Sequence, residues 1–231
     1  ASGPLAHLPG YDPLMQAYGG LMSVTGHPES PPTRVGTSVV DMGTGMWTAL
    51  GVMAALRERD RTGEGSHVVA SLLETAVAWM AYHVQGHLAT GEVPGRTGSG
   101  LGMIAPYEAF PAADGHVMIA AGNDGLFRRL CAALRLDALA DDDRFTTNAG
   151  RVAHREELSV AVAERTSELE VAALLEVLRE AGVPAAPIHD VAEVVADAQV
   201  RATGIIREAA HPEIAGYREV GMPVTFDGRR P

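Results

Sequence analysis

Apolar side chains recur at helical spacing in several stretches of the chain, separated by loops rich in glycine and proline. Leucine, methionine and tyrosine residues lie three or four positions apart over residues 12–24, which predicts a helix that opens at Asp12-Pro13. The pair Gly19-Gly20 weakens this helix and indicates that another group packs closely against it. A longer apolar helix is expected from Asp41 to the turn at Thr62-Gly63, and a third over residues 74–89.

Shorter apolar runs predict strands and amphipathic helices in the rest of the chain. The run over residues 66–73 predicts a buried strand, and residues 106–121 have the pattern of a hairpin. The remaining expected elements are helices over 123–136, 148–164, 168–181 and 197–203, a helix capped by Asp190, an extended segment over 183–188, and strands over 205–210 and 217–226. The hairpin and its helices, about residues 101–203, would form a small α+β domain inserted between parts of an α/β domain.

Composition narrows the classes of partner. The chain has 231 residues and a net charge of −11, and no basic stripe is present, which argues against nucleic acid or an anionic membrane as partner. Its single cysteine, Cys131, excludes an intrachain disulfide and fits a cytoplasmic location; we expect a small buried apolar residue there. No segment has 18 uninterrupted apolar residues, so we expect no membrane span.

Asp41, at the start of the long helix, is the candidate for chemistry. An Asp at a helix start is most simply an N-cap, whose carboxylate accepts a backbone N–H two or three residues on. It can also be a functional carboxylate, kept ionised by the helix dipole, with Gly43 and Gly45 leaving room for a ligand. An ionised carboxylate in that position can attack an activated acyl group. The two interpretations are compatible in one residue.

Two further features have the composition or spacing of a binding site. Residues 90–102 form a Gly-rich loop that lacks the strand and helix context of a dinucleotide site, so alone it is weak evidence. His83 and His87 lie four apart on one helical face, a spacing that can bind a metal, but no third ligand is evident. We expect no metal site there.

Three stretches in order resemble the class III CoA-transferases, the family of formyl-CoA and carnitine CoA-transferases. They are GPLAHLPGYDPLMQAYGGLMSVTG (3–26), VGTSVVDMGTGMWTALGVMAALRERDRTGEGSHVVASLLET (35–75) and IAPYEAFPAADGHVMIAAGNDGLFRRLC (104–131). The resemblance implies an α/β fold, with part of a Rossmann-like large domain plus a small α+β domain. Residues 1–100 would belong to the large domain, residues 101–203 would form the small one, and residues 204–231 would return to the large one. Members are longer, and the N-terminal Rossmann-like part and the C-terminal end are not visible here.

The resemblance also implies a mechanism. Asp41 falls on the family's catalytic nucleophile, which takes up an acyl group from an acyl-CoA and passes CoA to a carboxylic acid through an aspartyl-acyl anhydride. Coenzyme A is then a substrate and no metal is needed. The Gly-rich loop resembles the family's glycine loop, which assigns Gly98, Ser99 and Gly100 to a lid over the intermediate. Tyr11 could offer its hydroxyl to the substrate, although a core tyrosine is an equal interpretation. The family forms interlocked homodimers.

Two alternatives stay open at this stage. The 2-methylacyl-CoA racemases and epimerases have the same fold but carry a His where Tyr11 stands and a Glu about where Asn123 stands, with Asp124 adjacent. Because tyrosine has a high pKa in solution, it is a poor base near neutrality, and the pattern favours transfer. The other alternative is a non-catalytic fragment that keeps the scaffold.

Overall fold

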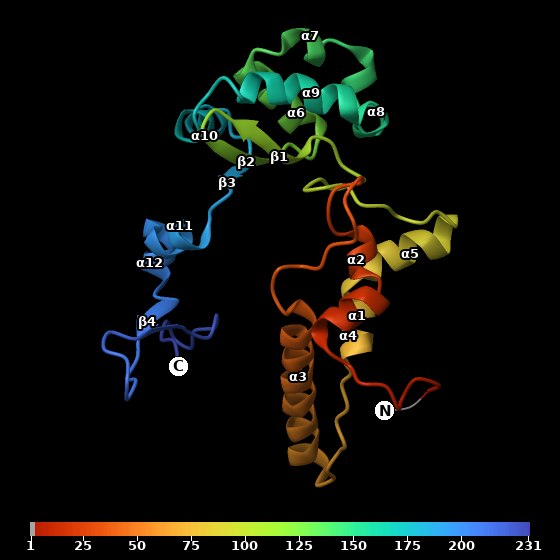
Figure 1. The fold of residues 1–231 in the computed structure, drawn as a ribbon, viewed down its shortest axis with the longest axis vertical. Coiled ribbons are helices and arrows are strands. Elements are labelled where there is room, and N and C mark those ends of the chain that lie inside the picture. Colours follow the sequence, from red (N-terminus) through yellow and green to blue (C-terminus); the bar gives the residue numbers. More distant parts are fainter. Residues whose placement is uncertain (1–2) are drawn as a thin grey trace. The chain divides into compact units, whose positions relative to one another are not determined.

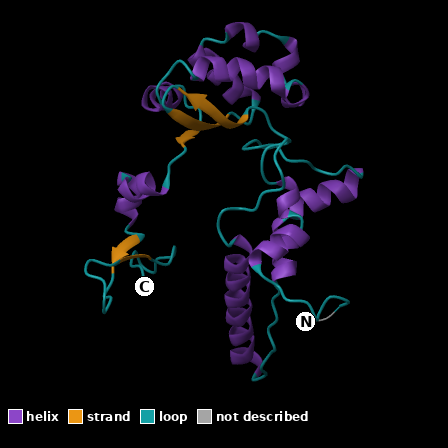
Figure 2. Ribbon diagram, in the orientation of Figure 1, coloured by secondary structure: helices purple, strands orange, loops and turns teal. Residues whose placement is uncertain are grey.

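A computed structural model describes residues 3–231, which divide into two compact units (Figure 1). Unit 1 comprises Ala1–Glu108 with Thr147–Arg155, and unit 2 comprises Ala109–Thr146 with Glu156–Pro231. The predicted domain limits near residues 100 and 203 stay predictions. Figure 2 shows the mixture of helix and strand that the sequence predicts, with helices in both units.

Unit 1 is built from helices. They are α1 (Asp12–Tyr18), α2 (Leu21–Val24), α3 (Val39–Thr62), α4 (Leu72–Trp79), α5 (Ala81–Thr90) and α8 (Asn148–Ala153). The expected helix over 12–24 is divided into α1 and α2 at Gly19-Gly20, where Gly20 has a φ of 91°. A Cβ at Gly19 would lie 2.5 Å from the Cβ of Ala76, so the glycine permits the close packing that the sequence indicates.

Two expectations for unit 1 were wrong in detail. The helix expected over 74–89 is two helices, α4 and α5, divided at Met80. Residues 66–70 form no strand but an extended segment that leads into α4, and Val69 is exposed. A strand needs a neighbour for its backbone hydrogen bonds, and no described residue of the chain pairs with this segment.

Helix α3 is the longest element and is mostly uncovered. It ends at Gly63, which adopts a φ of 78° and donates its N–H to the carbonyl of Arg59, as expected for a C-terminal glycine. Its apolar side chains are largely exposed, and only 11% of its most apolar 18-residue window is buried. By length and composition alone the helix could cross a membrane, with a mean hydropathy of 1.4 over that window. A single helix of this kind is weak evidence for a membrane span.

Unit 2 packs helices against a sheet. Strands β1 (Tyr107–Ala112), β2 (Gly115–Ala120) and β3 (Ala185–Pro187) form the sheet in that order, and β2 pairs antiparallel with β3. Helices α6 (Asp124–Leu134) and α10 (Val171–Glu180) contribute to its core. The fully buried side chains include Phe110, Ile119, Phe127, Leu158 and Leu174. The expected hairpin is present, and Cys131 is buried in α6 as predicted.

The remaining elements of unit 2 are short. They are α7 (Asp137–Ala140), a 3₁₀ turn η1 (Asp143–Phe145), α9 (Arg155–Thr166), α11 (Val191–Ala196), α12 (Ala198–Thr203) and the antiparallel pair β4 (Ile206–Glu208) and β5 (Arg218–Val220). The helix expected over 148–164 is interrupted at His154, which separates α8 from α9. Asp190 caps α11 in a capping box with Glu193, as the sequence predicts.

Candidate active site

The carboxylate of Asp41 lies in the first turn of α3 and is exposed to solvent. The N-cap position is Ser38, whose side chain makes no capping hydrogen bond. Within residues 3–231 we find no hydrogen bond or ion pair to the Asp41 carboxylate. The interpretation of Asp41 as an N-cap was therefore wrong.

A carboxylate from α1, that of Asp12, accepts hydrogen bonds from the first backbone amides of α3, which the side chain of Asp41 does not bind. Oδ2 of Asp12 accepts hydrogen bonds from the N–H of Val40 at 2.8 Å and of Asp41 at 3.1 Å, and Oδ1 accepts one from the side-chain amide of Gln16. Burial alone would raise the pKa of Asp12. The hydrogen bonds from Asp41, Gln16 and Val40, together with the charge of Arg34, outweigh burial and hold that pKa below its usual value. Asp12 is thus an ionised, buried cap on α3.

The two glycines after Asp41 have different surroundings. A Cβ at Gly43 would lie 2.7 Å from the indole of Trp79, so this side of α3 is filled by α4. Gly45 has nothing within 4 Å of such a Cβ. Residues four apart share a helix face, whereas residues two apart lie about 200° apart around the axis. Asp41 therefore lies on the same face of α3 as Gly45 and on the opposite face from Gly43. The open space that the sequence predicts is thus beside Gly45 alone.

Tyr11 immediately precedes Asp12, the residue that caps α3. It occupies the N-cap position of α1 with an extended backbone, and its side chain is 65% exposed. A core tyrosine would be buried, so that interpretation was wrong. The Asp12 cap ties the start of α1 to the start of α3, and Tyr11 and Asp41 therefore belong to the same end of unit 1. Asn123, compared above with a racemase residue, caps α6 in unit 2 through a hydrogen bond from the N–H of Leu126 at 2.9 Å.

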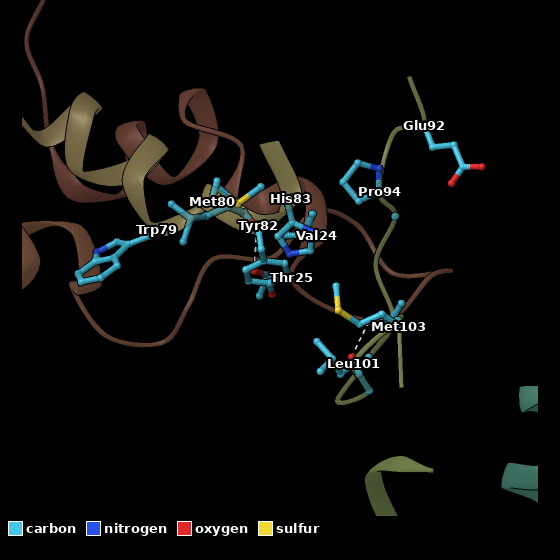
Figure 3. A pocket seen from close by; sticks show the side chains of 16 residues that line it. Val24, Thr25, Trp79, Met80, Tyr82, His83, Glu92, Pro94, Leu101 and Met103 are labelled. Atoms are coloured by element: carbon cyan, nitrogen blue, oxygen red, sulfur yellow. Dashed lines mark hydrogen bonds between the residues drawn. The ribbon is translucent and has the colours of Figure 1, made fainter. Parts of the chain in front are cut away.

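A cavity of about 580 Å³ lies within unit 1 (Figure 3). Gly98 and Gly100 line it, with Ser99 between them in the turn. Figure 3 shows Trp79 at one end, Leu101 and Met103 at the other, and His83 in the middle. Asp41 does not line this cavity. The structure therefore brings the predicted loop residues to this cavity and leaves Tyr11 and Asp41 outside it.

The Gly-rich loop is held at its N-terminal side by Arg96. The guanidinium donates to the carbonyls of His27 at 3.1 Å, Pro28 at 3.0 Å and Ser30 at 2.7 Å. Beside it, the N–H of Gly98 donates to the carbonyl of Gly26 at 2.9 Å. Gly98 has a φ of 65°, and a Cβ there would lie 2.9 Å from the imidazole of His27, so only glycine fits.

A second arginine holds the C-terminal side of the loop. Arg155 donates to the carbonyls of Leu101 at 2.8 Å, Gly102 at 3.3 Å and Ile104 at 2.6 Å, and lies 3.5 Å from the carboxylate of Glu108. The planar guanidinium groups of Arg96 and Arg155, each with five N–H donors, thus bind three main-chain carbonyls each on the two sides of this loop. These hydrogen bonds anchor both ends of the loop, and the assignment of Gly98, Ser99 and Gly100 to a lid stays a prediction.

His83 and His87 are both on α5 but have different surroundings. Burial lowers the pKa of His83, which lines the cavity with its ring centroid 4.1 Å from that of Tyr82. Nδ1 of His87 lies 2.9 Å from the carbonyl oxygen of Glu92 beyond the end of the helix. The described part of the chain contains no group of three His, Cys, Asp or Glu residues that could hold a metal ion.

With this geometry in place, comparison with known proteins decides the family. The model of CoA-transferase family III matches residues 1–231. The chain belongs to CoA-transferase family III. A succinate–glutarate CoA-transferase from Agrobacterium fabrum is 40% identical over 204 residues, which are 88% of this chain and 51% of that protein. An acetyl-CoA:oxalate CoA-transferase from Acetobacter aceti is 37% identical over 98% of this chain and 57% of its own length.

A solved member of the family has the same fold. The crystal structure of a CAIB/BAIF family protein from Brucella suis matches with a TM-score of 0.83 and 37% identity, over 99% of this chain and 59% of that one. The chain therefore spans about half the length of the curated relatives it matches. The family III fold expected from the sequence is confirmed.

The sequence carries no local signal for Asp12, Arg96 and Arg155, which hold the start of α3 and the Gly-rich loop in place. Asp12 before Pro13 has the pattern of a residue opening its own helix, and nothing local indicates a partner 28 residues later. Arg96 and Arg155 were not singled out. Each binds main-chain carbonyls, which carry no side-chain signal, so only the structure reveals these contacts.

Proposed function

We propose that the protein is a CoA-transferase in which Asp41 is the nucleophile. The observation that carries this proposal is an exposed carboxylate in the first turn of α3 that is not used as a cap. Open space beside Gly45, on the same helix face, gives a substrate access. Membership of family III and the names of the relatives support CoA transfer as the reaction.

The cycle begins when an Oδ atom of Asp41 attacks the carbonyl carbon of an acyl-CoA thioester. The C–S bond breaks, CoA leaves as a thiolate, and an aspartyl-acyl anhydride is formed. The carboxylate of the acceptor acid attacks the aspartyl carbonyl, which releases the donor acid and forms a second anhydride. The CoA thiolate then attacks the acceptor acyl carbon, and the carboxylate of Asp41 is regenerated. The aspartyl-acyl anhydride is the intermediate that the resemblance to the class III CoA-transferases implies.

We propose short dicarboxylic acids as the substrate class. The Agrobacterium relative is named for succinate and glutarate, and the Acetobacter relative is named for acetyl-CoA as well as for the dicarboxylic acid oxalate. Family III sequences from Haloarcula marismortui and Chloroflexus aurantiacus are named for mesaconate and citramalate, which are also dicarboxylic acids. The first assay therefore pairs succinyl-CoA with glutarate, oxalate and mesaconate, with acetate as the monocarboxylic comparison.

A homodimer is the proposed assembly. Met42, Met46, Leu50 and Met53 form an exposed apolar stripe along α3. Large exposed apolar patches mark interaction surfaces, and a second copy of the chain would cover this one. Sedimentation equilibrium of wild type and of Met46→Glu provides the test. A wild-type mass equal to one chain contradicts the dimer.

The decisive experiment is the Asp41→Ala variant of the full-length protein. CoA transfer is expected to be abolished, because the variant lacks the carboxylate that forms the proposed anhydride, while circular dichroism stays unchanged. In a parallel experiment, wild type is incubated with acyl-CoA donor and hydroxylamine without acceptor. Mass spectrometry is expected to find a hydroxamate on the peptide that contains Asp41.

A matched control comes from the same helix. Asp60, near the other end of α3, is also exposed, and Asp60→Ala is expected to transfer CoA at the wild-type rate. Transfer at that rate by Asp41→Ala would refute the nucleophile. Incorporation of solvent deuterium at the α-carbon of a 2-methylacyl-CoA, without CoA transfer, would identify a racemase instead.

A further inference from the structure

The buried pair Asp12 and Gln16 forms a polar network at the start of α3. Asp12 is 3% exposed and Gln16 is fully buried. Gln16 donates to Oδ1 of Asp12 through Nε2 and accepts the N–H of Val35 at 2.8 Å through Oε1. Oδ2 of Asp12 accepts the N–H groups of Val40 and Asp41. Both carboxylate oxygens of Asp12 therefore have defined donors.

An acidic side chain in the first turn of a helix, such as that of Asp41, could itself accept hydrogen bonds from the first backbone amides. The first amides of a helix have no partner within it, and a nearby carboxylate normally turns back to accept them. Here Asp12 already occupies the amides of Val40 and Asp41. The side chain of Asp41 is left outside this network and exposed.

We propose that Asp12, oriented by Gln16, is a positioning residue for Asp41. It fixes the first turn of α3 against α1, and by taking the amides it keeps the carboxylate of Asp41 from folding back as a cap. The inference rests on the proposed function for its catalytic consequence, while the hydrogen-bond network itself does not depend on it.

Three variants separate a misplaced Asp41 side chain from a loss of folded protein. Asp12→Ala removes the cap. Asp12→Asn keeps one oxygen for the α3 amides, but its new NH₂ group faces the NH₂ group of Gln16. Combining Asp12→Asn with Gln16→Glu reverses the hydrogen bond between the two side chains, because the Asn amide then donates to the Glu carboxylate, whose other oxygen accepts the N–H of Val35. Only the long hydrogen bond from Gln16 to the carbonyl of Thr37, at 3.5 Å, is lost.

The expected result is a loss in kcat with little change in KM. Because small misplacements of a reacting group cost on the order of 100-fold in rate, Asp12→Ala is expected to lower kcat by roughly that factor. Asp12→Asn should lie between Asp12→Ala and wild type, and the double variant should recover most of the lost activity. Because a loss of folded protein also lowers the apparent kcat at unchanged KM, each rate is divided by the folded fraction measured by circular dichroism.

Hydrogen exchange provides a readout that is independent of activity. In Asp12→Ala the amides of Val40 and Asp41 are expected to exchange faster, and in the double variant they are expected to regain protection. The control is Asp190→Ala, which removes an N-cap from α11 in unit 2 and is expected to leave transfer unchanged.

The outcomes distinguish this inference from the proposed function. If Asp41→Ala is inactive but Asp12→Ala has the wild-type kcat, the positioning role is refuted and the nucleophile stands. A folded double variant that stays as slow as Asp12→Ala also refutes positioning. If Asp41→Ala keeps wild-type transfer, the proposed function and the positioning role are both lost, whatever the exchange rates show.

Discussion

Unit 2 packs its large apolar side chains around a sheet, whereas unit 1 leaves most of its own in contact with solvent. Phe110, Phe127 and Leu174 of unit 2 are buried within a continuous core. In unit 1, by contrast, Met46 and Leu50 are exposed along α3. The fully buried groups of unit 1 include polar ones, such as Gln16 and Arg151. The end of unit 2 beyond β3 also exposes apolar side chains, so the contrast is with the sheet and its helices.

The comparison shows that the candidate nucleophile lies in the unit that relies on directed polar contacts. Hydrogen bonds fix geometry, but each contributes only about 1 kcal/mol, while burial of a large apolar side chain contributes about 1.5–3 kcal/mol. Unit 1 therefore has well-defined local geometry around Asp12, Arg96 and Arg155 with little apolar burial. Exposed apolar surface of this kind is typical of a region that binds another surface.

The largest effect on stability is expected from a substitution that creates a cavity in the core of unit 2. Phe127 is 1% exposed, and Phe127→Ala should lower the free energy of unfolding of unit 2 by about 3–5 kcal/mol. Urea denaturation followed by circular dichroism measures the change. The matched variant in unit 1 is Leu50→Ala, which removes a side chain already 59% exposed and should change stability by less than about 0.5 kcal/mol. Equal losses in the two variants would contradict the contrast between the units.

A smaller effect is expected from filling the contact between α3 and α4. In Gly43→Ala the new methyl group meets the rigid indole of Trp79 at 2.7 Å, and the helices must move apart. Such overpacking costs roughly 1–3 kcal/mol. Gly45→Ala is the control on the same helix: nothing lies within 4 Å, and replacing an exposed helical glycine should stabilise by about 0.5–1 kcal/mol. Hydrogen exchange of the α4 amides locates the change, and a stable Gly43→Ala would show that the contact is loose.

The smallest effect is expected on the stability of the folded chain at low pH. Because the pKa of Asp12 is held below its usual value of 3.8, its ionised form stabilises the folded chain fully above that value. This contribution is lost as the pH falls through the lowered pKa of the folded state. Wild type should therefore lose more stability than Asp12→Asn as the pH falls below about 4. Parallel loss in both proteins, measured as urea midpoints at each pH, would show that Asp12 contributes no such stabilisation.

Much of unit 2 could be predicted because its signals are local. The hairpin, the cap at Asp190 and the buried Cys131 each follow from a few neighbouring residues. The strand expected over 66–73 failed because an apolar run is ambiguous until its neighbours are known. Helix breaks at Met80 and His154 also carry no glycine or proline that would have marked them.

The candidate site was predicted only in part. The resemblance placed Asp41 at the start of the long helix, and the structure places it there with an exposed carboxylate. Its use as a cap was excluded by Asp12, which lies 29 residues earlier, and such a distant contact has no local pattern. For the Gly-rich loop, composition indicated flexibility, whereas the donors of Arg96 and Arg155 restrain it from outside.

The chain has two tryptophans, and both lie at the junction of α3 and α4, with the centroids of Trp47 and Trp79 5.9 Å apart. Intrinsic indole fluorescence therefore observes unit 1 alone and is blind to the sheet of unit 2. A single denaturation experiment, recorded at once by emission and by far-ultraviolet ellipticity, would resolve whether unit 1 melts before the better-packed unit 2, without the introduction of any label.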